Sequence, residues 1–181
     1  MRLKFNAPVT LSFSLICVTV YVFDTIFMQQ VLPYFTVHPT IQWTNPFSLL
    51  TLITHVFGHV SLEHLIGNLT FILLLGPIIE EKFGSSTVLY MILFTALITG
   101  IINVFFFSTA LTGASGIVFM FILLVSFTNV RSGEIPITFI LIAILFIGKE
   151  LINSFGTNHI SESAHIIGGI CGSIFGFRLM R

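Results

Sequence analysis

The segment Leu111-Thr112-Gly113-Ala114-Ser115-Gly116 opens the apolar run 117–129 and places a serine hydroxyl between two glycines. Two other stretches carry polar residues within apolar surroundings: His64-Leu65-Ile66-Gly67-Asn68 and Ala164-His165-Ile166-Ile167-Gly168-Gly169. The chain therefore offers a candidate nucleophile, a candidate base and candidate oxyanion donors on three separate apolar segments.

The composition is that of an integral membrane protein. Of the 181 residues, 55% are hydrophobic and only 8% are charged, and the mean hydropathy is +1.06. A soluble domain carries roughly 25% charged residues, so this chain could not cover a water-facing surface. The net charge is zero, which gives no indication of a nucleic-acid partner. Cys17 and Cys171 both lie inside apolar runs, so a disulfide framework is not expected.

The hydropathy pattern predicts an all-α bundle of six transmembrane helices in one domain, residues 1–181. A helix needs about 20 apolar residues to cross the bilayer, and the windows that qualify or nearly do are about 8–28, 62–79, 86–107, 115–129, 135–151 and 163–180. The first window lacks a small-residue cleavage site and is interpreted as a retained span, not a signal peptide. The connection 29–58 is too polar and proline-rich to cross, but its part 47–54 can lie at the interface or against the bundle.

The basic residues predict that both termini are cytoplasmic, because lysine and arginine favour that side. With the N-terminus inside, six of the seven basic residues are cytoplasmic and only Lys149 is not. The same residues give a depth scale at ~1.5 Å per helical residue. Ser115 precedes Arg131 by 16 positions, or roughly 24 Å. His165 and Asn68 lie at a similar height above the basic residues that follow them at the cytoplasmic ends of their own spans. Three residues with unrelated structural roles would have no reason to share one depth.

Each of these residues also has a purely structural interpretation. Ser115 can be a helix N-cap, and Asn68 can be an interhelical hydrogen-bonding residue. His165 is harder to explain in this way, because an ionisable residue inside a span is costly and indicates function. Gly168, with Gly172 and Gly176, forms a four-residue repeat that allows close helix approach, and His165 lies one turn before it.

The residue types fit serine hydrolase chemistry. A serine hydroxyl needs a base to take its proton, and His165 can do this and then protonate the leaving amine. The backbone N–H of Ser115 and the side chains of His64 and Asn68 can stabilise the tetrahedral oxyanion. No carboxylate is clearly placed as a third member: Glu162 lies one turn from His165 and Asp24 near the outer end of the first span. The prediction is therefore a Ser115–His165 dyad.

A metal site is the competing interpretation of one part of the chain. His55, His59 and His64 follow one another at metal-ligand spacing with Glu63 beside the last. The His-Glu-x-x-His order of zinc proteases and cysteine ligands are missing, so no metal is expected. His55 and His59 are instead predicted to pack or cap where the first loop returns to the bundle.

These residues resemble the rhomboid family of intramembrane serine proteases, over about residues 54–176. The resemblance rests on these motifs, in the family's order: His59, His64-x3-Asn68, Gly76-x3-Glu80-x3-Gly84, Gly113-Ala114-Ser115-Gly116 and Ala164-His165-x2-Gly168-x3-Gly172. It implies a Ser115–His165 dyad and an oxyanion hole of His64, Asn68 and the Ser115 amide. It also implies supporting roles for Gly113, Gly116, Phe119 and Gly168, and a structural role for Glu80. Substrates would enter beside the fifth span, under the loop 153–161.

The chain departs from the family pattern at two places. Many members carry a Trp-Arg pair in the first loop, where this chain has Leu50-Thr51. Many also have tyrosine one turn after the nucleophile, where this chain has Phe119, which can stack on His165 but has no hydroxyl. Neither departure affects the dyad.

The predicted function is thus cofactor-free cleavage of single-pass or polytopic membrane proteins in or near their transmembrane segments. The predicted setting is the lipid bilayer of a cell (plasma) membrane, of prokaryotic type, with the protein as a multi-pass component. The main alternative is a catalytically silent rhomboid-like protein that binds membrane clients, and relatives of that kind usually lack the serine or the histidine. A small transporter is disfavoured because the two halves of the chain show no repeat.

Overall fold

The computed structural model describes residues 5–128, 134–154 and 162–179, and these residues form a helical bundle without named strands. The all-helical class predicted from the sequence is therefore confirmed for the described part. Short 3-10 helices follow α1 and α2, at Leu32–Phe35 and His55–Phe57. The α-helices are α1 (Pro8–Ile26), α2 (Pro46–Thr54), α3 (Leu62–Phe83), α4 (Ser85–Phe106), α5 (Ser115–Val125), α6 (Ile137–Ser154) and α7 (Glu162–Leu179).

Each predicted apolar window coincides with one helix, and the segment 47–54 lies within α2. Among the described residues, α1, α3 and α4 have the length and apolar composition that a bilayer crossing requires. The apolar helices α5 and α7 are shorter. The helix boundaries follow local signals: proline begins α1 and α2, and the Ser61 side chain caps α3 by accepting from the His64 N–H.

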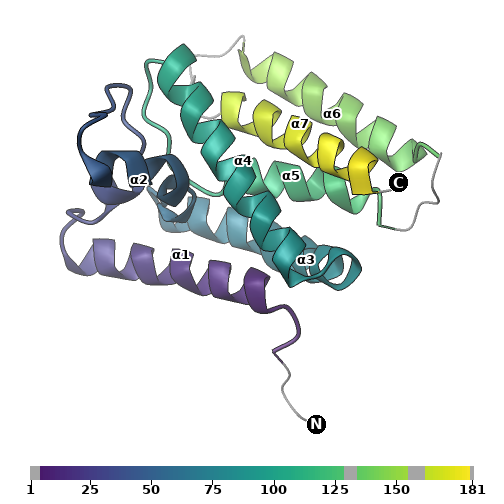
Figure 1. Cartoon of the computed structure of the whole chain (residues 1–181), viewed down its shortest axis with the longest axis horizontal. Coiled ribbons are helices and arrows are strands. Elements are labelled where there is room, and N and C mark those ends of the chain that lie inside the picture. The colour runs from purple at the N-terminus through teal and green to yellow at the C-terminus, as the bar shows by residue number, and fades with distance from the viewer. Residues whose placement is uncertain (1–4, 129–133, 155–161, 180–181) are drawn as a thin grey trace.

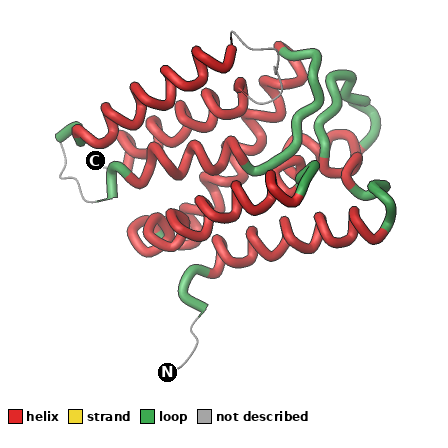
Figure 2. The backbone as a smooth tube through the Cα atoms, turned by 180° about the vertical axis from the view of Figure 1, so that it is seen from behind, coloured by secondary structure: helices red, strands yellow, loops and turns green. Residues whose placement is uncertain are grey.

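Four α-helices, α3, α4, α6 and α7, contact α5, and eight of its 11 residues are buried (Figure 1). Its main partner is α7, and α3 lies on another side of it. The helices α1 and α6 lie at opposite sides of the bundle, as the view from behind also shows (Figure 2). This arrangement puts the first turn of α5 at the centre of the molecule.

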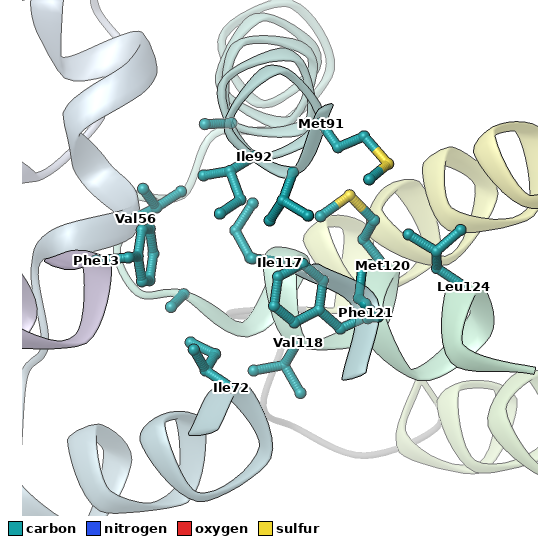
Figure 3. Packing of buried hydrophobic residues seen from close by; sticks show 14 of the residues in the cluster. Phe13, Val56, Ile72, Met91, Ile92, Ile117, Val118, Met120, Phe121 and Leu124 are labelled. Carbon is teal, nitrogen blue, oxygen red and sulfur yellow. The ribbon is translucent and has the colours of Figure 1, made fainter. Parts of the chain in front are cut away.

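Apolar side chains from five elements meet around α5 (Figure 3). They include Phe13 of α1, Val56 beside α2, Ile72 of α3, Ile92 of α4 and Phe121 of α5. Each of these side chains is less than 5% exposed. The core therefore fixes α5 from several directions, and the residues at its N-terminus have a defined setting.

The first loop, residues 29–58, is tied to the segment that precedes α5. Val37 and Leu111 exchange two backbone hydrogen bonds of 2.9 Å in an isolated antiparallel bridge. The hydroxyl of Thr112 donates to the Phe35 carbonyl at 2.9 Å, and the Gly113 N–H donates to the His55 carbonyl at 2.9 Å. The loop thus holds the approach to Ser115 in place.

The predicted structural role of Glu80 is confirmed. Its carboxylate accepts hydrogen bonds from the backbone N–H groups of Val9 and Thr10, each at 2.9 Å, and from the Thr10 hydroxyl at 2.8 Å. The first N–H groups of a helix have no partner within the helix, so this acidic side chain caps α1 and fastens it to α3. Gly76, one turn earlier on α3, lies directly against the Thr10 side chain.

Candidate active site

Ser115 is the first residue of α5, and it is 9% exposed. Gly113, two residues earlier, has a φ of +111°, which side-chain-bearing residues rarely adopt. This glycine lets the chain turn from its bridge with the first loop into the helix. The serine therefore lies at a helix N-terminus, where free backbone N–H groups favour negative charge.

His165 lies on α7 beside the first turn of α5. Gly168 is so close to Gly116 that a Cβ atom at residue 168 would overlap the Gly116 backbone carbonyl. The imidazole of His165 packs against the ring of Phe119, with centroids 4.4 Å apart and planes inclined by 43°. Since Phe119 lies one turn after Ser115, the structure brings the predicted base to the helix turn that carries the predicted nucleophile.

His64 lies on the other side of the nucleophile segment. A Cβ atom at Gly113 would be 2.8 Å from His64 Nε2, which shows that the imidazole lies directly against the Gly113 backbone. The absence of a side chain at residue 113 thus makes room for His64, two residues before Ser115. The prediction that Gly168 allows close helix approach agrees with its contact on Gly116. The supporting roles of Gly113 and Gly116 stay predictions.

Asn68 is buried one turn after His64, with 7% of its surface exposed. Its Nδ2 lies 3.1 Å from Nε2 of His59. The rings of His59 and His64 meet edge to face with centroids 5.0 Å apart. The structure therefore places His64 against Gly113 and links it through His59 to Asn68. The oxyanion hole of His64, Asn68 and the Ser115 amide stays a prediction.

His55 and His59 are held by backbone carbonyl groups. Nδ1 of His55 lies 3.1 Å from the Thr51 oxygen and its Nε2 lies 3.3 Å from the Thr99 hydroxyl. Nδ1 of His59 lies 3.2 Å from the Phe57 oxygen. These contacts agree with the predicted packing role. Within the described ranges, no three His, Cys, Asp or Glu side chains are grouped as metal ligands would be.

Burial also sets the protonation of these two histidines, which lie outside the predicted spans. Both are 1% exposed. Burial disfavours the charged imidazolium and lowers the pKa of His55 to about 4. Burial, with a smaller effect from the neighbouring His64, lowers the pKa of His59 to about 4. Both rings are therefore neutral at pH 7.

Asp24 has a structural role in the first loop. Its Oδ1 accepts the backbone N–H groups of Val31 and Leu32 at 3.0 and 2.7 Å. This bond holds the chain where it leaves α1, so Asp24 is committed to the loop. The predicted entry loop 153–161 lies for the most part outside the described residues.

The arrangement as a whole suits acyl transfer. Ser115 lies at a helix N-terminus, His165 packs on Phe119 one turn further along that helix, and His64 lies against Gly113 two residues before the serine. The contact between His59 and Asn68 was not predicted from the sequence. The two are nine positions apart, and the signal that could have revealed the contact is Gly58 followed by the Ser61 cap, which turns the chain back onto α3.

Comparison with known proteins identifies relatives over nearly the whole chain. The family model of the rhomboid domain matches residues 46–181. The rhomboid protease GlpG of Haemophilus influenzae is 25% identical over 175 residues, which cover 95% of this chain and 91% of that protein. The rhomboid proteases GlpG of Salmonella paratyphi A and Salmonella typhi are each 29% identical over 178 residues. Those alignments cover 94% of this chain and 62% of the relatives' own length.

Proposed function

Because the chain belongs to the rhomboid family, we propose that it is an intramembrane serine protease with a Ser115–His165 dyad. The observation that carries the proposal is the packing of His165 on Phe119, at a centroid distance of 4.4 Å, together with the contact of Gly168 on Gly116. These two contacts hold α7 and the His165 ring beside the first turn of α5, which supports the assignment of His165 as the base. The relatives named as proteases support the same activity.

In the proposed reaction, His165 removes the proton from the Ser115 hydroxyl as the oxygen attacks the scissile carbonyl carbon. The carbon becomes tetrahedral and its oxygen becomes negative. His165 then gives the proton to the leaving amine, and the C–N bond breaks to leave an acyl-enzyme. A water molecule, deprotonated by the same histidine, hydrolyses the ester and restores Ser115.

The oxyanion hole in this proposal consists of the Ser115 backbone N–H, the Asn68 side chain and His64. The first supplies a donor at a helix N-terminus. The other two lie on one face of α3, with His64 against Gly113. In soluble proteases, loss of one such donor lowers kcat by roughly 10²- to 10³-fold. No cofactor is needed for this chemistry.

The membrane setting explains why the site lies within the bundle. We propose six spans, formed by α1, α3, α4, α5, α6 and α7, with both termini cytoplasmic. Helix α5 has 11 residues and is therefore about 17 Å long, which is shorter than the ~30 Å hydrocarbon layer. If its C-terminal end reaches the inner boundary, Ser115 lies below the outer surface and can cut a membrane-embedded substrate near the outer face.

The substrates in this proposal are single-pass or polytopic proteins of the plasma membrane. The test uses proteoliposomes that hold the protein and a panel of single-pass proteins, each with a fluorescent N-terminal domain. Wild type should release a soluble fluorescent fragment, whereas Ser115→Ala and His165→Ala should not. Equal release by Ser115→Ala would sink the mechanism, and binding of panel members without cleavage by wild type would favour the client-binding alternative.

A further inference from the structure

The hydrogen bonds of His59 fix which of its nitrogens carries the proton. Nδ1 lies 3.2 Å from the Phe57 carbonyl oxygen, and a carbonyl can only accept. Nδ1 must therefore donate. A neutral imidazole has a single N–H, so Nε2 of His59 has a lone pair and can only accept. The pKa of His59, lowered to about 4 by burial, agrees with this neutral form.

This assignment fixes the orientation of the Asn68 amide as well. Nε2 of His59 lies 3.1 Å from the Asn68 side chain, and an acceptor there requires a donor, so the amide must present its NH2 group. The amide nitrogen has two hydrogens. One is used by His59, and the second has no hydrogen-bond partner among the residues that the structure describes. With the amide reversed, its oxygen would meet the His59 lone pair and the NH2 group would point elsewhere.

We propose that His59 is a positioning residue for the oxyanion hole: it holds the Asn68 amide so that its second N–H faces the developing oxyanion. This inference rests on the proposed protease function. His59 also packs edge to face on His64, at a centroid distance of 5.0 Å. The same imidazole thus orients one proposed donor by a hydrogen bond and contacts another by its ring.

The experiment compares side chains that place an acceptor at different distances from the backbone. The carbonyl oxygen of glutamine is as many bonds from Cβ as Nε2 of histidine, whereas that of asparagine corresponds to Nδ1. Labelling of Ser115 by a fluorophosphonate places a phosphoryl oxygen in the oxyanion hole, so its maximal rate at saturating probe reports on the hole. His59→Gln should stay within about threefold of wild type, and His59→Asn and His59→Leu should fall by about tenfold or more.

A double-mutant cycle separates positioning from general packing. If His59 acts through Asn68, His59→Leu should lower the maximal labelling rate in the wild-type background. In the Asn68→Ala background, the same substitution should lower that rate by no more than about twofold. The probe concentration for half-maximal rate should change little. The matched control is His38→Leu, which replaces an exposed histidine of the first loop and should label like wild type.

Two results would overturn this role. One is equal labelling rates for His59→Gln and His59→Asn in folded samples, and the other is multiplicative effects of His59→Leu and Asn68→Ala. If His59→Leu does not fold, the comparison of glutamine with asparagine decides alone. A folded wild type that the probe does not label would remove the proposed function itself, and the role of His59 with it.

Discussion

Gly168 of α7 lies directly on the backbone carbonyl of Gly116 in α5, with no space for a side chain between them. The contact continues along the two helices, where Gly172 lies against the Met120 carbonyl. Gly116 follows Ser115 in the chain, and Gly168 lies one turn after His165. The close approach of the two helices therefore sets the distance between the two proposed catalytic residues.

A methyl group at residue 168 should separate the helices and slow the reaction. We expect Gly168→Ala to destabilise the protein by about 1–3 kcal/mol, because the overlap is with backbone and cannot be relieved by a side-chain rotation. Thermal unfolding in detergent and fluorophosphonate labelling measure the two effects, and labelling should fall at least about tenfold. Gly67→Ala is the control, since no atom lies within 4 Å of its Cβ position. Equal behaviour of the two variants would contradict this account.

The ring of Phe119 should matter for activity through its contact with His165. Phe119→Leu removes the aromatic contact, which is worth about 0.5–1.5 kcal/mol, and should lower the rate of Ser115 labelling by about tenfold. Phe119→Tyr keeps the ring and should label at a rate close to wild type. If Leu and Tyr at this position label equally fast, the contact at 4.4 Å has no part in placing the base.

A side chain at residue 113 should displace His64. Gly113→Ala meets two penalties: a φ of +111° and a clash with the imidazole. Gly84→Ala meets only the first, because Gly84 has a φ of +81° and open space around its Cβ position. Both variants should lose about 1 kcal/mol or more of stability, measured by thermal unfolding. Only Gly113→Ala should lose most of its labelling, and similar labelling by the two would rule out the placement of His64.

Loss of the Glu80 carboxylate should destabilise the fold without changing the chemistry. Glu80→Gln leaves at least one N–H group at the start of α1 without a good acceptor, at a cost of about 2 kcal/mol or more. Glu81→Gln changes an exposed neighbour and should change stability by less than about 0.5 kcal/mol. Below the unfolding temperature, both variants should label at the wild-type rate. The same unfolding temperature for both would argue against the capping role.

The protein should become less stable as the pH falls from about 6.5 to about 4. His55 and His59 have a pKa of about 4 when folded and an ordinary value of about 6.5 when unfolded. In this range the unfolded chain binds more protons, so each histidine favours unfolding by up to about 3 kcal/mol. Unfolding temperatures measured across this range should drop, and His55→Gln should reduce the slope. A flat profile for wild type would contradict the burial of these rings.

The sequence predicts most of the helices because their signal is local. Apolar runs of bilayer length locate α1, α3 and α4, and the apolar part 47–54 of the first loop lies within α2. The glycine repeat from Gly168 to Gly176 correctly indicates a close helix contact, since a four-residue spacing puts these residues on one face. The partner of that face could not be inferred in the same way, because many helices present small residues.

The contacts between distant segments could not be predicted from the residues alone. Nothing in the local pattern pairs Val37 with Leu111, since an isolated bridge lacks the alternation of a strand. Glu80 was expected to be structural, but its partner at the start of α1 is about 70 positions away. The hydrogen bond between His59 and Asn68 depends on how the chain turns back onto α3. From the sequence, His59 could therefore be predicted only to pack or cap.

The most direct test of the central claim is to locate the covalent adduct of a fluorophosphonate probe by mass spectrometry. Wild type, Ser115→Ala and His165→Ala are treated in detergent after folding has been checked by thermal unfolding. We predict one adduct in wild type, on the peptide that contains Ser115, none in Ser115→Ala, and strongly reduced labelling in His165→Ala. An adduct on a different residue, or equal labelling of His165→Ala and wild type, would contradict a serine activated by that histidine.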